Sequence, residues 1–341
     1  MFLDDVKFLK RVVEIPSIGD CSQLANFLSE QFTEWGIDNH IDSVGNVIAT
    51  VGSGKTLLLT SHMDTVPGNI PVRIENGNLY GRGSVDAKSG LAAFAWLMKD
   101  LADSGLKVIF IGVVDEEGES KGARAILDKY KPDFVINGEP SGWDGITISY
   151  RGCIKFECEI KLEERHSSTQ DSAPLLLNDF INKIRNYLGG SGPSFSSANL
   201  EVPNIEGNNH RARMRLMVRT PAEFNIEDFQ GFIESNKEDI NVNFLEETPA
   251  VLAGKNNELV RALIAGIREE GEPVFKRKTG TSDMNLFAQW NCPIVSYAAG
   301  DSKLDHTPNE HLNIEEWRRS LRILRSAIRS LVNNISDGNK E

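Results

Sequence analysis

Short apolar runs alternate with helix-like segments along the first part of the chain. The run at 56–60 is largely apolar, which is typical of a strand covered on both faces. Similar runs predict strands at 107–114 and 133–137, and helices are expected at 3–14, 22–35, 89–101 and 122–130. Strands that alternate with helices are joined by crossover connections, so this part predicts a mostly parallel sheet.

The pattern changes near residue 146. Residues 146–161 and 211–219 alternate between apolar and polar side chains, and one helix is expected between them at about 173–187. Alternation of this kind indicates an antiparallel sheet with one solvated face. We therefore expect a separate α+β domain in this part of the chain.

Helical and buried-strand patterns return near residue 255. A helix is expected up to about residue 270, a strand at 293–297, and a last helix with Asn313 as N-cap and Glu316 three residues later. The simplest fold is an α/β domain with a mostly parallel mixed sheet, interrupted by a smaller α+β domain. The expected boundaries are 1–149 and 251–341 for the first domain and 150–250 for the insertion.

Charge and composition exclude several classes of protein. The 341 residues include 37 Lys and Arg against 49 Asp and Glu, for a formal net charge of −12. This argues against a nucleic-acid-coating protein, which needs clustered positive charge. A content of 40% hydrophobic and 25% charged residues indicates a folded chain. No apolar run approaches the roughly 20 residues of a membrane helix, so no membrane association is expected.

The cysteines and the N-terminus indicate a cytoplasmic protein. The four cysteines are scattered and form no CxxC pair, which disfavours both a disulfide framework and a thiolate zinc site. The first residues are charged and carry no secretory apolar segment. We therefore expect a reducing, cytoplasmic compartment.

Histidines and carboxylates follow the buried strands. In open parallel sheets, ligands bind beyond the carboxyl ends of the strands, so these turns are expected to converge. One such residue alone would more often be a helix cap or a solvated loop residue, but the set together favours metal binding. Its nitrogen and oxygen ligands suit zinc, cobalt or manganese, and their number suits two ions. The positions are His62, Asp64, Asp86, Asp115, Glu116, Glu117, Glu139, Asp301, Asp305 and His306.

Five motifs follow one another along the chain. They are Ser-His62-Met-Asp64-Thr-Val-Pro, Gly81-Arg-Gly-Ser-Val-Asp86-Ala-Lys88, Asp115-Glu116-Glu117-Gly, Gly138-Glu139-Pro and Asp305-His306-Thr-Pro-Asn-Glu310. In this order they resemble the motifs of the di-zinc deacylase/aminopeptidase family, which includes carboxypeptidase G, aminoacylase, acetylornithine deacetylase and succinyl-diaminopimelate desuccinylase. The resemblance spans nearly the whole chain and implies a catalytic domain with an inserted lid/dimerisation domain, in a homodimer.

The resemblance implies two divalent metal ions, zinc or else cobalt. His62, Asp86 and Glu139 would hold one ion. Asp86, Glu117 and His306 would hold the other, with Asp86 as the bridge.

Two acids would complete the catalytic machinery. The resemblance makes Asp64 the partner that fixes the tautomer of His62. It makes Glu116 the general base, which takes a proton from metal-bound water and returns it to the leaving amine. The alternative for Glu116 is a solvated loop acid.

The inserted domain holds further candidates. His166 matches a family histidine that reaches the active site of the partner subunit and stabilises the oxyanion; a loop histidine with only a structural hydrogen bond is the alternative. The family pattern departs at Met217, where an acid usually stands. The implied substrate contacts are Asn209 or its neighbour Asn208, Arg219 and Thr281.

An arginine-rich strand is relevant to the choice of substrate or partner. Arg211, Arg213, Arg215 and Arg219 share one face of the expected strand at 211–219. This face is either an ordinary solvated surface or a docking site for an acidic partner.

Residues 138–146 and 280–285 most resemble the branch of the family that releases lysine, or ornithine, from the terminal glutamate of a small acidic amino-group carrier protein. A small-molecule deacylase acting on N-acetylornithine or succinyl-diaminopimelate is the alternative. A non-catalytic binding protein is disfavoured because every expected ligand and the base are present.

Overall fold

The computed structural model describes residues 4–163, 172–189 and 194–338. The chain forms two compact units. The first comprises the described residues of Met1–Ile148, Ala253–Lys276 and Ser282–Glu341, and the second those of Ser149–Leu252 and Arg277–Thr281. The short segment Arg277–Thr281, which we expected in the catalytic domain, therefore groups with the insertion. The buried Arg151 holds it there, because Nε of Arg151 donates to the carbonyl oxygen of Thr279 at 2.8 Å.

A mixed sheet forms the centre of the first unit; β13 and the last residues of β8 and β14 are grouped with the second unit. Its order is β1-β2-β6-β3-β7-β15-β8-β13, with β14 paired to β8. The inner pairs β6-β3, β3-β7 and β7-β15 are parallel, which confirms the mostly parallel sheet. The strands are β1 (Asp38–Ile41), β2 (Val47–Gly52), β3 (Thr56–His62), β6 (Lys107–Val113), β7 (Phe134–Asn137), β8 (Gly145–Tyr150), β13 (Val251–Leu252), β14 (Val274–Lys278) and β15 (Ile294–Ser296).

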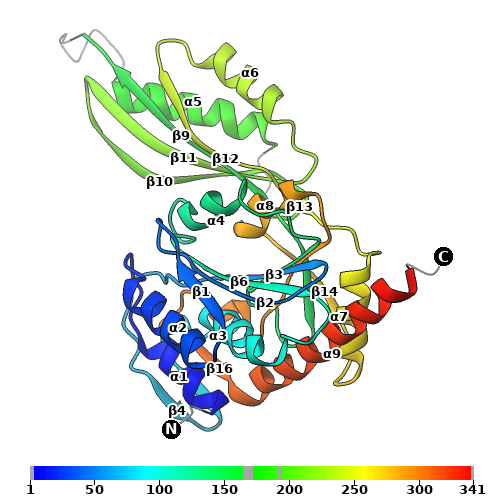
Figure 1. Cartoon of the computed structure of the whole chain (residues 1–341). Helices are drawn as coiled ribbons and strands as arrows, with labels where there is room; N and C mark the ends of the chain where they lie inside the picture. Colours follow the sequence, from blue (N-terminus) through cyan, green and yellow to red (C-terminus); the bar gives the residue numbers. More distant parts are fainter. Residues whose placement is uncertain (1–3, 164–171, 190–193, 339–341) are drawn as a thin grey trace. The chain divides into compact units, whose positions relative to one another are not determined.

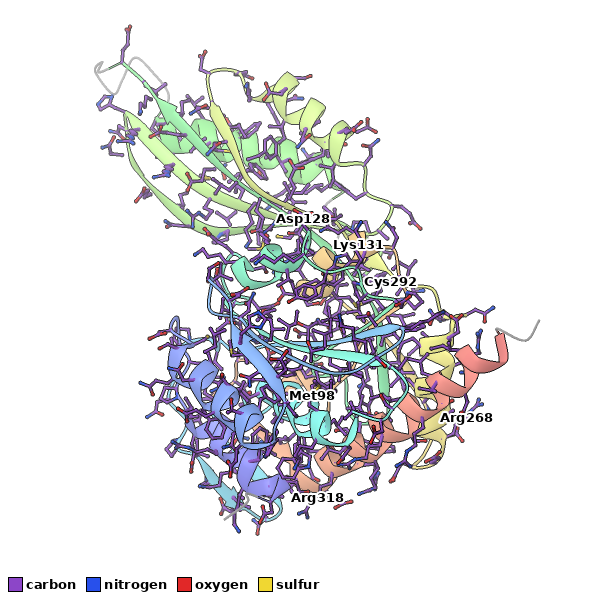
Figure 2. The ribbon with its side chains drawn as sticks, in the orientation of Figure 1. Met98, Asp128, Lys131, Arg268, Cys292 and Arg318 are labelled. Carbon is purple, nitrogen blue, oxygen red and sulfur yellow. The ribbon has the colours of Figure 1, made fainter. Side chains whose placement is uncertain are left out.

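Helices cover this sheet. In Figure 1, α1, α2 and α3 lie on one side of β2, β3 and β6, while α4 and α8 lie on the other. The buried core between the layers includes Phe94, Phe110, Trp317 and Met98, the last labelled in Figure 2. The helices are α1 (Asp5–Glu14), α2 (Ser22–Glu34), α3 (Lys88–Leu97), α4 (Lys121–Ile126), α7 (Glu258–Arg268), α8 (Asp283–Phe287) and α9 (Ile314–Gly338).

Two local features precede the long helix α9. Asn313 accepts a hydrogen bond from the main-chain nitrogen of Glu316 at 3.0 Å, which confirms Asn313 as the N-cap. The second feature is a small sheet of order β16-β5-β4, whose strand β16 ends directly before α9. The sequence pattern did not predict this sheet. Its strands are β4 (Arg73–Glu75), β5 (Asn78–Tyr80) and β16 (His311–Asn313).

The second unit is an antiparallel sheet of order β10-β11-β9-β12 with two helices. On β11 the burial alternates residue by residue, and the buried side packs with the helices around Phe156 and Phe229. This agrees with the alternation in the sequence. The elements are β9 (Gly152–Lys161), α5 (Ala173–Tyr187), β10 (Asn199–Asn208), β11 (Arg211–Thr220), α6 (Ile226–Asn236) and β12 (Asn241–Thr248).

Among the described residues, none of the helices combines the length and the apolar character that crossing a membrane requires.

Candidate metal centre

The expected ligands gather at one edge of the first unit's sheet. Because β3, β6, β7 and β15 are parallel, their carboxyl ends meet there. The loop before α3 adds Asp86. The residues that follow or end these strands are His62 on β3, Glu117 after β6, Glu139 after β7 and His306 after β15.

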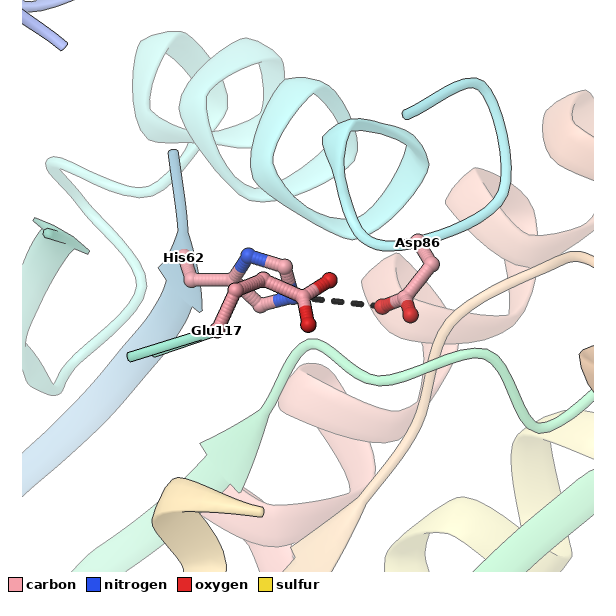
Figure 3. A group of neighbouring side chains, drawn as sticks. All are labelled: His62, Asp86 and Glu117. Atoms are coloured by element: carbon pink, nitrogen blue, oxygen red, sulfur yellow. Dashed lines mark hydrogen bonds and ion pairs between the residues drawn. The ribbon is translucent and has the colours of Figure 1, made fainter. Parts of the chain in front are cut away.

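Asp86 lies between two imidazole rings. Its Oδ1 is 3.1 Å from Nε2 of His62, and its Oδ2 is 3.1 Å from Nε2 of His306. Glu117 Oε1 is 2.9 Å from the same nitrogen of His306, and Glu139 Oε1 is 3.9 Å from Nε2 of His62. Figure 3 shows the His62 ring and the carboxylates of Asp86 and Glu117 pointing toward one another, and their ligand atoms lie within 4.8 Å. One carboxylate that faces two imidazoles with different oxygens has the arrangement of a bridging ligand.

The hydrogen bonds of His62 show that the space between its ring and the Asp86 carboxylate fits a cation. Its Nδ1 lies 2.9 Å from the main-chain carbonyl oxygen of Asp64, so this nitrogen carries the ring proton. Nε2 therefore presents its lone pair to the carboxylate of Asp86. Two lone pairs at 3.1 Å repel each other unless a proton or a metal ion lies between them. Imidazole nitrogen with carboxylate oxygen is also the donor set that zinc, cobalt and manganese accept.

Asp64 acts differently from our expectation. Its carboxylate oxygen is 3.7 Å from Nδ1 of His62, too far for a hydrogen bond, and the main-chain carbonyl orients the ring instead. The two carboxylate oxygens accept from the main-chain nitrogens of Glu116 and Glu117, at 3.1 and 2.9 Å. The Asp64 side chain thus holds the loop that carries the expected base and a ligand.

Burial and negative charge dominate the electrostatics of the site. Burial raises the pKa of Glu116 well above its ordinary value, and the carboxylates of Glu139 and Asp283 add to the effect. For His62, burial opposes the charged form, but the nearby carboxylates outweigh it and raise the pKa. Bound cations would offset this concentration of acids.

Asp283, within residues 280–285, is a buried acid for which the sequence predicted no role. It is 1% exposed at the start of α8, and burial raises its pKa to about 7. The charge of His62 lowers this pKa and the charge of Asp64 raises it. In the sequence, the only indication that Asp283 belongs to the site is its closeness to Thr281, an expected substrate contact.

The pKa of His306 leads to a prediction for the metal-free protein. Hydrogen bonds to Asp86 and Glu117 raise this pKa from 6.5 to about 10. A raised folded-state pKa stabilises the protein fully below pH 6.5, and the contribution is lost as the pH rises through about 10. We expect urea denaturation with chelator present to give a free energy of unfolding that falls over this range. The His306→Gln variant should show a shallower fall, and an equally steep fall would contradict the interaction.

Two expected substrate contacts in the second unit lie together. Nη1 of Arg219 donates to the hydroxyl of Thr281 at 2.8 Å, although the two residues are far apart in sequence. Asn209 is not near this pair, because it lies in the turn before β11 and Arg219 lies near the end of that strand. At roughly 3.3 Å per residue, the strand separates them by about 30 Å. His166 lies outside the described residues.

The arginine-rich face of β11 is neutralised locally. Arg211 forms an ion pair with Glu159 of β9, and Arg213 and Arg215 both pair with Glu157. These acids belong to the neighbouring strand of the same sheet. The structure thus favours the ordinary solvated face over a basic docking stripe.

Comparisons with known proteins agree with this geometry. The model of peptidase family M20/M25/M40 matches residues 58–330. The LysW-lysine hydrolase of Deinococcus radiodurans is 36% identical, covering 96% of this chain and 96% of its own. The LysW-lysine/LysW-ornithine hydrolase of Sulfurisphaera tokodaii is 32% identical, covering 95% of this chain and 96% of its own.

Solved structures show the same fold. A tripeptidase from Staphylococcus aureus superposes with a TM-score of 0.82 at 19% identity, covering 98% of this chain and 100% of its own. A dinuclear metal-binding peptidase from Bacillus subtilis superposes with a TM-score of 0.72 at 14% identity, covering 96% and 97%. These structures show the fold, and the family model with the two relatives confirms the resemblance expected from the five motifs.

Proposed function

The chain belongs to peptidase family M20/M25/M40, and we propose that it is a metal-dependent hydrolase that releases lysine or ornithine from the terminal glutamate of the acidic carrier protein LysW. The names of two relatives, similar over nearly their full length, support this substrate. The observation that carries the reaction type is Asp86, whose two oxygens face two different imidazoles.

Two divalent ions would be held by the residues at the strand ends. We assign His62, Asp86 and Glu139 to one ion and Asp86, Glu117 and His306 to the other, with zinc as the metal and cobalt as a substitute. When bound, such ions supply Lewis-acid activation of water and of the amide carbonyl.

Glu116 is the proposed general base. It takes one proton from the attacking water while the oxygen of that water bonds to the amide carbon. It then gives the same proton to the nitrogen of the leaving lysine or ornithine as the carbon–nitrogen bond breaks. Because the carboxylate of Asp64 holds the main-chain nitrogens of Glu116 and Glu117, the base keeps a fixed place beside the ligand.

The second unit would contribute substrate contacts and a subunit interface. We assign substrate binding to Arg219 and Thr281, which already hydrogen-bond each other, while Asn209 and His166 remain predictions from the family resemblance.

We also propose a homodimer that pairs through β10. This strand lies at the edge of its sheet, and Ile205 on it is 57% exposed. An unpaired, exposed edge is a template for another strand. Light scattering should give the mass of two chains, and Ile205→Lys should shift it toward one. A wild-type chain that stays monomeric at high concentration would contradict the dimer.

The four cysteines are free thiols, which supports the cytoplasmic location that we propose.

The substrate assignment is tested by comparing kcat/KM for four compounds with zinc present. These are the carrier–lysine conjugate, the carrier–ornithine conjugate, N-acetylornithine and succinyl-diaminopimelate. We expect at least one carrier conjugate to exceed both small molecules by about 100-fold, since remote contacts with the carrier add transition-state binding. Cleavage of N-acetylornithine with no cleavage of either conjugate would show a small-molecule deacylase instead.

A further inference from the structure

A completely buried carboxylate lies behind the proposed metal centre. Glu310 is 0% exposed, although acids are almost never buried without partners. Its Oε2 accepts from Nη1 of Arg82 at 2.7 Å and from the main-chain nitrogen of Gly83 at 3.1 Å. Its Oε1 accepts from the main-chain nitrogens of Val85 and Asp86, at 2.9 and 3.1 Å. Four donors thus satisfy one carboxylate, and three of them are main-chain groups of the loop that ends at Asp86.

The loop of residues 81–86 needs this support to hold its shape. It lies between β5 and α3, and its own main-chain hydrogen bonds are turns, from Ser84 N to Gly81 O at 3.1 Å and from Lys88 N to Gly83 O at 3.0 Å. At Gly83 the backbone has a φ of +82°, and an added Cβ would lie 2.7 Å from the Thr65 side chain. The small residue lets the loop pack closely here, and the main-chain nitrogens of Gly83, Val85 and Asp86 point toward the Glu310 carboxylate.

Glu310 and His306 hold Asp86 from two directions. Both belong to the segment after β15, more than two hundred residues along the chain from Asp86. The His306 ring contacts the side chain of Asp86, at Oδ2. The Glu310 carboxylate contacts the main chain of the same residue. The two contacts together fix the position of Asp86 and the direction of its carboxylate relative to the second imidazole.

We propose that Glu310 is a positioning residue for the metal centre, which holds the bridging carboxylate of Asp86 in place through the main chain of residues 83–86. The inference rests on the proposed function, because it takes Asp86 as the bridging ligand. Glu310 does not touch the metal or the substrate. Residues that orient metal ligands typically contribute about 10–100-fold to metal affinity.

The role is tested with Glu310→Gln and Glu310→Asp. In the Gln variant an NH2 group replaces one carboxylate oxygen and faces two donors, so two of the four hydrogen bonds are lost whichever way the amide turns. The Asp variant keeps the charge, but its shorter side chain cannot reach both sets of donors. The Asp variant also provides a test of the role if the Gln variant does not fold.

Asp133→Asn is the matched control. Asp133 is an exposed carboxylate of the first unit that also accepts from a main-chain nitrogen, that of Thr56, at 2.7 Å. Thr56 begins β3, and His62 ends it. The control thus removes the negative charge of a carboxylate–main-chain contact at the opposite end of the strand from the site.

Zinc affinity is measured by competition with a chelating dye, and the visible spectrum of the cobalt-loaded protein reports the ligand geometry. Urea denaturation of each metal-free variant records stability separately. We expect both Glu310 variants to bind zinc about 10–100-fold more weakly than the wild type and to shift the cobalt spectrum, with Asp133→Asn unchanged in both.

Two results would overturn the positioning role while the proposed function stands. One is wild-type zinc affinity and cobalt spectrum in folded Glu310 variants. The other is failure of both variants to fold, which would make Glu310 a requirement of the whole fold. If the wild-type protein itself binds no zinc, the proposed function fails and the inference fails with it.

Discussion

Replacing Glu116 with Gln is expected to lower kcat by about 10²–10⁴-fold while both metal ions remain bound. The amide has nearly the shape of the carboxylate but cannot accept the proton of the attacking water. The expected ligands are other residues, and the Asp64 carboxylate holds Glu116 through its main-chain nitrogen, which the substitution leaves in place. KM should therefore change much less than kcat.

The measurement pairs steady-state kinetics with metal analysis of the purified variant. Glu119→Gln is the control, since Glu119 lies on the same loop but its side chain is 78% exposed. We expect it to keep wild-type kcat. A Glu116→Gln enzyme with both metals and full turnover would show that another group moves the proton.

Replacing Asp86 with Ala is expected to remove both ions at once and to reduce kcat/KM to the level of chelator-treated wild type. The residue faces both imidazoles, so no single ion keeps a full ligand set without it. Metal activation is worth several kcal/mol of transition-state stabilisation. At 1.36 kcal/mol for each factor of ten, the loss is about 10³-fold or more.

Metal content by plasma mass spectrometry checks this prediction, with Asp128→Ala as the control. Asp128 is an exposed acid after α4, labelled in Figure 2. If the Asp86→Ala protein kept one tightly bound ion and most of its activity, Asp86 would not be the bridge.

Much of the site follows from one rule about parallel sheets. Apolar runs are recognisable in sequence, and whatever follows their carboxyl ends must meet at one edge. This rule places His62, Glu117 and Glu139 together without any knowledge of the fold's details. The positions of Asp86 and His306 are harder to predict from sequence, because these residues lie in irregular loops whose paths depend on contacts such as those of Glu310.

Other features could not be predicted from the local sequence pattern. The family resemblance implied a contact between the side chains of His62 and Asp64, yet the main-chain carbonyl of Asp64 takes that place because the carboxylate binds the next loop. On β10 nearly every residue is exposed, so it lacks the alternation that reveals a strand. The arginines of β11 follow the expected alternation, but their neutralisation by Glu157 and Glu159 depends on strand register, which the sequence pattern does not specify.

The central claim is that a metal-dependent cleavage frees an amino acid from the carrier. Its most direct test is the intact mass of a LysW–lysine conjugate after incubation with the enzyme, with zinc or with a chelator. We predict that the carrier loses the mass of one lysine residue with zinc, that free lysine appears in equal amount, and that neither occurs with chelator. An unchanged conjugate mass with zinc-loaded enzyme, or equal cleavage in chelator, would contradict the account.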